Sequence, residues 1–207
     1  MPKLKIGSHS SISNGLERAL YNVKIIGGDA VQIFSKSPRS RVIIPKFTEN
    51  DMECTKDFIK NNDTYLVIHS SYLVLPVKGI ETKFSANSVI EDMKTIGKLL
   101  DKSGCIIHMK GKNKDMTEEE AEKNLQKFIK YVINNTPSNT YLILENTAGQ
   151  KNELFPDISD FCDFYEKIPS KIRKRVRICI DTCHAFAAGN DISSAKSVKH
   201  FFNIIDT

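Results

Sequence analysis

The chain has 207 residues, of which 40% are hydrophobic, so it can bury a sizeable core and is not a disordered protein. It contains no apolar run of about 18 residues, and its N-terminal segment lacks the apolar region of a signal peptide, so we expect an intracellular protein without a membrane span. The formal net charge of +5 permits a polyanionic partner without requiring one.

The cysteines predict free thiols. Their number is odd and no CxxC spacing occurs, which argues against a disulfide framework and against a zinc knuckle. They are Cys54, Cys105, Cys162, Cys179 and Cys183. Cys183 stands between Asp181 and His184, and we expect it to pack in the core rather than join those polar residues.

Short apolar runs alternate with amphipathic stretches along the whole chain. We expect strands over residues 4–8, 30–34, 64–68, 105–108, 141–145 and 176–181. We expect helices over residues 16–23, 48–61, 89–100, 117–132, 161–168 and from 193 onward. Thr117 and Glu120 have the spacing of a capping box, which marks the start of the fourth of these helices.

Strands that alternate with helices predict parallel βαβ units and an α/β fold. The turn after the first strand reads GSHSSISNG and does not match the GxGxxG of a dinucleotide-binding sheet. We therefore predict a single TIM (β/α)8 barrel domain over residues 1–207. Six βα units are visible and such barrels usually need about 250 residues, so the expected barrel is truncated after about six units.

Four expected strands end in side chains that can bind metal. The candidate ligands are His69, His108, Glu145, Asp181 and, three residues later, His184. In this kind of barrel the carboxyl ends of the strands meet at one rim, so these groups should converge. Imidazole and carboxylate together suit Zn²⁺ or Mn²⁺, and a carboxylate can bridge two ions that activate a shared water. The set indicates hydrolysis.

The other two histidines outside this set are expected to be structural. His9 follows the first strand and should support the site rather than bind metal, and His200 in the last helix should face solvent.

Two basic clusters follow strands and should lie at the same rim as the candidate ligands. They comprise Lys36, Arg39 and Arg41, and then Lys110, Lys112 and Lys114. Either cluster is open to two interpretations, a solvated loop or a contact with phosphates.

Five segments, in chain order, carry a resemblance to a known family. They read IGSHSSISNGLERAL, VQIFSKSPRS, VIHSSYLV, LENTAGQ and ICIDTCHAFAAGND. Together they resemble the apurinic/apyrimidinic endonuclease IV family of DNA repair enzymes, and the resemblance covers essentially the whole chain. ENTAGQ and IDTCHAFAAG are its most specific parts.

The resemblance implies a TIM barrel that holds three Zn²⁺, with Mn²⁺ as an alternative at part of the site. It implies hydrolysis of the phosphodiester 5′ of an abasic site in double-stranded DNA, leaving a 3′-hydroxyl and a 5′-deoxyribose phosphate. By position, His69 and His108 would hold one zinc, Glu145 would bridge it to a second, Asp181 would hold that second zinc, and His184 would bind the third. Glu145 is the residue on which catalysis would depend.

The same resemblance assigns DNA contacts to Arg39 and Tyr72. Members of the family insert loop side chains through the minor groove beside a flipped abasic nucleotide. A guanidinium and a phenol can replace lost base stacking, and an abasic nucleotide has no base pair to break.

Three departures from the family pattern stand out. Ser70 follows the first ligand histidine where the family usually has aspartate, and Met109-Lys110 follow the second where the family has Pro-Gly. The family's further zinc ligands would lie beyond Thr207, so we expect the activity to depend on their being supplied.

Two other interpretations remain open. The same donors could serve a metal-dependent sugar isomerase or epimerase of the xylose-isomerase-like barrel type, or the chain could be a non-catalytic DNA-binding fragment. The sequence leaves the oligomeric state undetermined.

Overall fold

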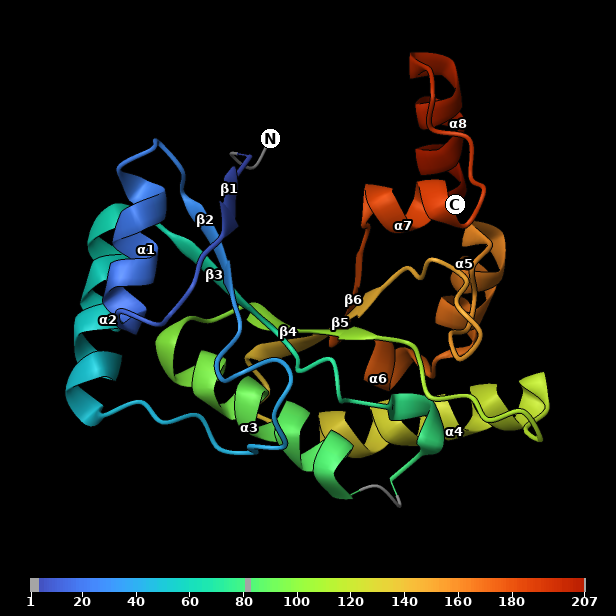
Figure 1. The fold of residues 1–207 in the computed structure, drawn as a ribbon, viewed down its shortest axis with the longest axis horizontal. Helices are drawn as coiled ribbons and strands as arrows, with labels where there is room; N and C mark the ends of the chain where they lie inside the picture. Colours follow the sequence, from blue (N-terminus) through green and yellow to red (C-terminus); the bar gives the residue numbers. More distant parts are fainter. Residues whose placement is uncertain (1–3, 81–82, 207) are drawn as a thin grey trace. The chain divides into compact units, whose positions relative to one another are not determined.

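The computed structural model describes residues 4–80 and 83–206 as parallel strands that alternate with helices (Figure 1). The strands are β1 (Gly7–His9), β2 (Ala30–Ile33), β3 (Tyr65–His69), β4 (Ser103–His108), β5 (Thr140–Glu145) and β6 (Val176–Cys179). They follow one another in the sheet in chain order. This arrangement confirms the predicted α/β fold with six successive strands.

The helices are α1 (Leu16–Lys24), α2 (Glu49–Asn62), the 3₁₀ turn η1 (Pro76–Lys78), α3 (Lys83–Leu99), α4 (Glu118–Asn134), α5 (Ile158–Lys167), α6 (Ser170–Arg173), α7 (Thr182–Ala187) and α8 (Ala195–Ile205). Among the described residues, none of these helices has the length and apolar character that crossing a bilayer requires.

The chain divides into two compact units. The first comprises Met1–Leu73, Asn87–Ile106 and Asn135–Tyr141, and the second comprises Val74–Ala86, Ile107–Asn134 and Leu142–Thr207.

In the first unit, α1 and α2 pack together beside the strands β1 to β3 (Figure 1). The buried face of α1 consists of Leu16, Ala19, Leu20 and Val23, the residues whose helical spacing predicted it. β3 pairs with β4 so that His69 lies opposite Ile106. Gly104 of β4 passes so close to the backbone of Tyr141 that a Cβ would collide with its carbonyl, which explains a glycine inside a buried strand.

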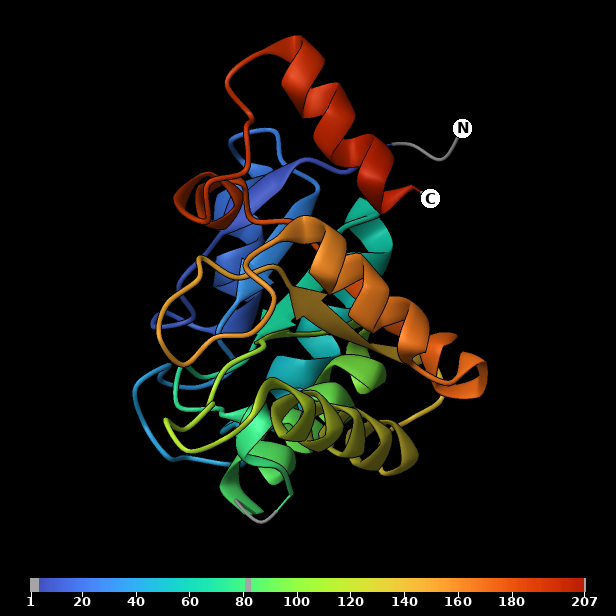
Figure 2. The same ribbon diagram turned by 90° about the vertical axis from the view of Figure 1, so that its right-hand side faces the viewer.

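In the second unit, β5 and β6 pair with Glu145 opposite Cys179. α4 begins at the predicted capping box, in which the Thr117 amide donates to Glu120 Oε2 at 2.9 Å and the Glu120 amide donates to Thr117 Oγ1 at 3.2 Å. Its buried face contains Ala121, Leu125, Phe128, Ile129 and Val132, as the helical spacing predicted. α5 packs against α8, and both are visible from the side in Figure 2.

The observed elements differ from the predicted ones near both ends of the chain and at α3, which begins at Lys83 rather than at 89. The first strand spans Gly7–His9 rather than 4–8, because the Ile6 amide donates to the Asp29 carboxylate at 2.8 Å instead of joining a strand ladder. The sixth strand ends at Cys179, and Asp181 caps the unpredicted helix α7. Two further short elements, η1 and α6, were also not predicted.

The expectation for Cys183 is wrong. We expected it in the core on the assumption that the strand continued to Asp181, but the residue lies in α7 and is exposed. On that helix Ala185 faces inward instead. The described cysteines are free thiols, as predicted, and His200 is exposed on α8.

Candidate functional site

The carboxylate of Glu145 lies between two imidazoles of the second unit. Its Oε2 is 3.6 Å from Nε2 of His108, and its Oε1 is 3.3 Å from Nδ1 of His184. The two imidazole rings are 5.3 Å apart between centroids. Glu145 ends β5 and is only 5% exposed, whereas the two histidines are partly open to solvent. Each carboxylate oxygen therefore faces a different imidazole ring.

Asp181 joins this group from the start of α7. Its Oδ1 accepts the amide of His184 at 3.0 Å, so the carboxylate caps the helix, and its Oδ2 is 3.9 Å from Nδ1 of the same histidine. One ligand atom from each of Glu145, Asp181 and His184 lies within 4.8 Å of the others. Capping and metal binding are compatible here, because the cap uses only one of the two oxygens.

Asn146 is a functional candidate that the sequence analysis missed. Its Oδ1 accepts the Asp181 amide at 2.6 Å, its Nδ2 donates to the Asp181 carbonyl at 3.1 Å, and its own carbonyl lies 3.0 Å from Nδ1 of His184. A carbonyl can only accept, so Nδ1 of His184 carries the proton and Nε2 keeps the lone pair for a metal. The position of Asn146 directly after Glu145, within ENTAGQ, was the signal that could have identified it.

His69 belongs to the first unit, where it ends β3 and is 7% exposed. Its Nδ1 lies 2.8 Å from the carbonyl of Ser70, so this nitrogen is the donor and Nε2 carries the lone pair. The Ser70 main chain therefore orients the ring. Its part in a metal site remains a prediction from the sequence.

His9 lies near His69 in the first unit. The Gln32 side-chain nitrogen is 3.0 Å from Nδ1 of His9, and the ring contacts Phe34 with a centroid distance of 4.8 Å. Burial, and then the nearby charge of His69, lower the pKa of His9.

Arg39 and Tyr72 lie on two loops that hydrogen bonds join directly. The carbonyl of Pro38 accepts the amide of Tyr72 at 2.9 Å and the hydroxyl of Ser71 at 2.8 Å. Tyr72 is 42% exposed and its ring packs edge-on against Phe34 at 5.3 Å, while Arg39 is exposed. Both predicted DNA contacts are therefore accessible, and their loops are tied to each other.

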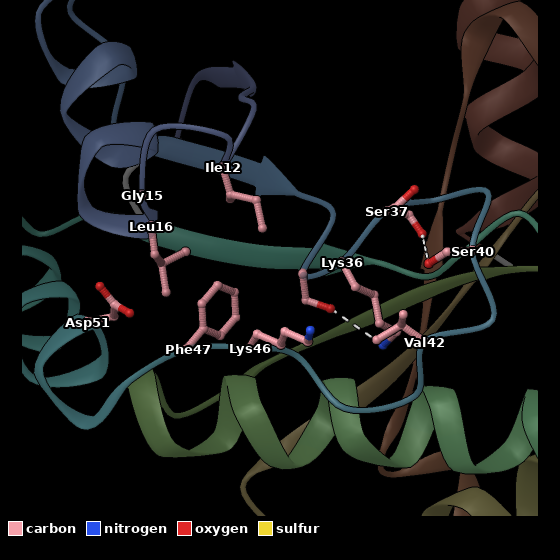
Figure 3. Close-up of a pocket in the computed structure, with 11 residues that line it drawn as sticks. Ile12, Gly15, Leu16, Lys36, Ser37, Ser40, Val42, Lys46, Phe47 and Asp51 are labelled. Carbon is pink, nitrogen blue, oxygen red and sulfur yellow. Dashed lines mark hydrogen bonds between the residues drawn. The ribbon is translucent and has the colours of Figure 1, made fainter.

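A pocket of about 390 Å³ opens beside the first of these loops (Figure 3). Its walls include Leu16 from α1, Phe47 before α2, and the lysines Lys36 and Lys46. The assignment of Lys36 to an exposed basic cluster is wrong, because its side chain is only 5% exposed and pairs with Asp92 at 2.5 Å. A buried and paired ammonium cannot contact a phosphate on the surface.

The second basic cluster is also more structured than expected. Lys112 pairs with Glu118. Lys110 is half-buried, and burial lowers its pKa against the opposing effect of Glu153. Lys114 is exposed, so of the three lysines in this cluster it can contact an anion from solution most readily.

The loop that follows His108 has a defined shape despite its departure from the family pattern. Met109 is fully buried and its carbonyl accepts the amide of Leu154 at 2.9 Å. Gly111 adopts a φ of 116°, which favours glycine, and donates to the Asn152 carbonyl at 2.7 Å. Burial of Met109 and pairing with residues 152–154 thus hold the loop where the family has Pro-Gly.

Cys179 lies opposite Glu145 on β6, and its surroundings favour the protonated thiol. Burial, and then the charges of Glu145 and Asp181, raise the pKa of its thiol to about 12. Among the described residues, the groups that could hold a metal ion consist of histidines and carboxylates.

Comparison with known proteins defines the class. Residues 20–206 match the family model described as "Xylose isomerase-like TIM barrel". The crystal structure of endonuclease IV from Thermus thermophilus superimposes with a TM-score of 0.76 at 24% identity, covering 98% of this chain and 71% of that chain. A D-tagatose 3-epimerase-like protein superimposes with a TM-score of 0.67 at 13% identity, covering 94% and 72%. Both likenesses confirm the predicted TIM-barrel fold class.

Relatives found by sequence show which family within that class the chain belongs to. A protein of Acanthamoeba polyphaga mimivirus named "Putative endonuclease 4" is 36% identical over 211 residues, covering 98% of this chain and 66% of the relative. A "Probable endonuclease 4" of Halothermothrix orenii is 30% identical, covering 98% of this chain and 72% of the relative. The chain belongs to the endonuclease IV family. It spans 66% of the length of the mimivirus relative.

Proposed function

We propose that this chain is the metal-binding and DNA-binding part of a repair endonuclease that hydrolyses the phosphodiester 5′ of abasic sites. The products would be a 3′-hydroxyl and a 5′-deoxyribose phosphate. The observation that carries the proposal is the Glu145 carboxylate, whose two oxygens face His108 and His184. Relatives named endonuclease 4, and one in Plasmodium berghei named "Apurinic-apyrimidinic endonuclease 1", support the substrate.

The donor set fits Zn²⁺. Glu145, Asp181 and His184 each offer one ligand atom within 4.8 Å of the others, and the His108 ring lies 5.3 Å from the His184 ring. We propose that His108, Glu145, Asp181 and His184 bind zinc together with His69, and that a complete site would hold three ions, with Mn²⁺ as an alternative in part. Bound zinc would lower the pKa of a water ligand to about 7 and offset charge on the phosphoryl oxygens.

The remaining work falls to side chains of this chain. The Asn146 carbonyl holds the His184 ring, and the Asn146 side chain holds the start of α7, so the donors are in place before a metal binds. Arg39 and Tyr72 would enter double-stranded DNA beside the abasic nucleotide, where no base opposes them.

Replacing Glu145 by Gln tests the proposal. Glu145→Gln keeps the size of the side chain but removes its charge, so we expect cleavage of a duplex with one abasic site to fall by more than about 100-fold, beyond the usual effect of a supporting residue. Affinity for the same DNA should change little. Glu122→Gln is the matched control, since Glu122 pairs with Lys167 on the surface and should tolerate the change.

Two results would count against the proposal, one against the role of Glu145 and one against the function as a whole. Full turnover by Glu145→Gln in a zinc-replete assay would contradict the role of this carboxylate. A wild-type protein that takes up no zinc and binds intact and abasic duplexes equally would refute the proposed function.

A further inference from the structure

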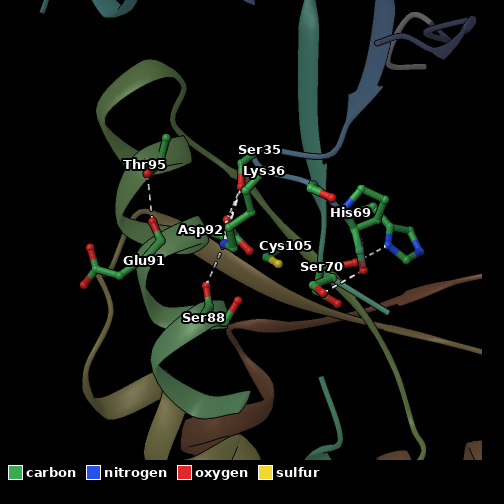
Figure 4. A network of polar contacts seen from close by, with 12 residues as sticks. Ser35, Lys36, His69, Ser70, Ser88, Glu91, Asp92, Thr95 and Cys105 are labelled. Atoms are coloured by element: carbon green, nitrogen blue, oxygen red, sulfur yellow. Dashed lines mark hydrogen bonds and ion pairs between the residues drawn. The ribbon is translucent and has the colours of Figure 1, made fainter. Parts of the chain in front are cut away.

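A buried ion pair lies at the base of the loop that carries Arg39 (Figure 4). Lys36 Nζ is 2.5 Å from Asp92 Oδ1 and 3.3 Å from the carbonyl of Ser88, which its ammonium reaches as a donor. The Ser35 hydroxyl donates to the same Asp92 oxygen. Side-chain exposure is 5% for Lys36 and 1% for Asp92, so the pair is largely shielded from water.

The pair connects the loop to the centre of the first unit. Asp92 lies on α3, whose neighbouring Met93 and nearby Ile96 are completely buried. Lys36 lies three residues after the end of β2. A loop residue is thus fastened to a helix 56 positions away in the sequence, where the surrounding core leaves little freedom.

Hydrogen bonds of the residues that follow Lys36 hold the two loops that carry the predicted DNA contacts, Arg39 and Tyr72. The Ser37 carbonyl accepts the amide of Ser40 at 3.2 Å and its hydroxyl at 3.1 Å, which closes a tight turn around Arg39. Within that turn, the Pro38 carbonyl accepts the amide of Tyr72. Displacement of Lys36 would therefore move the turn and loosen Tyr72.

Stability alone does not account for this pair. Desolvation offsets most of the attraction in a buried ion pair, and well-packed apolar residues often serve as well or better. Here Oδ2 of Asp92 and the hydroxyl of Ser88 are buried without a hydrogen-bond partner. Burial also raises the pKa of Asp92, and the opposing effects of Lys36 and Ser35 do not cancel that rise. What a short ion pair adds over apolar contact is one defined geometry.

We propose that Lys36 and Asp92 are positioning residues that hold the Arg39 turn and the Tyr72 loop in the geometry required to recognise an abasic nucleotide. The inference rests on the proposed function, in which Arg39 and Tyr72 enter the DNA. It assigns Lys36 and Asp92 an indirect role, since neither residue would touch the substrate.

The first arm of the test needs no DNA. Lys36→Met with Asp92→Leu replaces the pair by apolar side chains and should preserve the fold, judged by thermal unfolding. Amide hydrogen exchange should then accelerate at Tyr72 and Ser40 by about tenfold or more, equivalent to about 1.4 kcal/mol. Exchange in β3 and α3 should stay as in the wild type, which a general loss of structure would not allow.

The control is an ion pair on the same helix. Lys94 and Glu91 are 2.8 Å apart on α3 but lie 48% and 28% exposed. Lys94→Met with Glu91→Leu makes the same chemical change at the surface, and it should leave exchange at Tyr72 and Ser40 unaltered. If the buried double variant fails to fold, Asp92→Asn removes the charge while keeping the shape, and it should show the same local acceleration.

The second arm measures binding to matched duplexes with and without one abasic site. The buried double variant should lose about tenfold of the wild-type preference for the abasic duplex, and the surface variant should keep it. Unchanged exchange at Tyr72, or an unchanged preference despite faster exchange, would overturn the positioning role. A wild-type protein without any abasic preference would instead refute the proposed function, whatever the exchange data show.

Discussion

Single residues near Glu145 combine structural and chemical roles. Asp181 caps a helix with one oxygen and presents the other to the candidate metal site. Asn146 fixes the Asp181 main chain with its side chain and the His184 ring with its carbonyl. Because the same short segments carry both roles, the donors are held in place by the fold itself.

This arrangement predicts the effect of removing the Asn146 side chain. Asn146→Ala deletes both hydrogen bonds to Asp181, and we expect zinc affinity to fall by about 10- to 100-fold, the usual cost of losing a residue that supports a metal ligand. Competition with a chromogenic chelator would measure the change.

Asn139→Ala serves as the control for that experiment. Asn139 donates to the Gly97 carbonyl at 3.0 Å and to Asp101 at 2.6 Å, so its removal costs comparable hydrogen bonds in the first unit. Equal zinc affinity in both variants would rule out a supporting role for Asn146.

At the scale of elements, the helix starts are defined by side-chain caps. α2 has a complete capping box, in which Asp51 accepts the Thr48 amide and hydroxyl, each at 2.8 Å, and donates its own amide to Thr48 Oγ1 at 3.1 Å. α8 begins in the same way at Ser194 and Ser197. These local contacts explain why α2 and α8 begin within two residues of their predicted starts, whereas α3 begins at Lys83 rather than at 89.

The α2 box should give stability a specific pH dependence. The backbone hydrogen bond from Thr48, and then its hydroxyl, lower the pKa of Asp51 below its ordinary value of 3.8. A lowered folded-state pKa contributes stability above the unfolded value, and this contribution is lost as the pH falls through the folded value. The wild type should therefore unfold at a higher temperature than Asp51→Asn near pH 7. This difference in unfolding temperature should shrink as the pH falls into the acid range.

Glu53→Gln provides the comparison, since Glu53 is exposed on the same helix and takes no part in the box. Thermal unfolding of both variants between about pH 7 and pH 3 would decide the matter. If the difference in unfolding temperature between the wild type and Asp51→Asn stays constant across this range, the charge of the Asp51 carboxylate does not stabilise the helix.

At the scale of the whole molecule, the net charge of +5 is less available to an anion than the sequence implies. Lys36 is buried against Asp92, and Lys112 pairs with Glu118. Arg39 and Lys114 are exposed after β2 and β4, whereas Lys174 is exposed just before β6. In a parallel sheet these positions belong to opposite strand ends, so only the first two should approach DNA at the proposed site.

The salt dependence of DNA binding should reflect this distribution. Binding should weaken steeply with added salt, and Lys114→Gln should reduce the slope by about one if that lysine meets a phosphate. Lys174→Gln, which removes the same charge at the other strand end, should leave the slope unchanged. Identical slopes for both variants would exclude Lys114 from the DNA contact.

Much of the fold and of the candidate site was predictable because the signals are local. Helical spacing identified the buried faces of α1 and α4, and apolar runs placed β3, β4 and β5 within a residue or two. Since parallel strands end at one edge, His108 and Glu145 could be expected to lie together before any distance was known. The end of β6 was missed because the Asp181 cap ends a strand whose apolar pattern continues.

The sequence by itself determined the order of the strands and the longer helices, the family, and the residue types able to bind metal, since periodicity, caps and motifs depend on neighbours in the chain. Only the tertiary structure decided that Lys36 is buried, that Cys183 is exposed, and that Asn146 links Asp181 to His184. These outcomes depend on partners between 35 and 56 positions away, or on which face of a helix meets the core. Burial and pairing at such separations are properties of packing, and no local pattern encodes them.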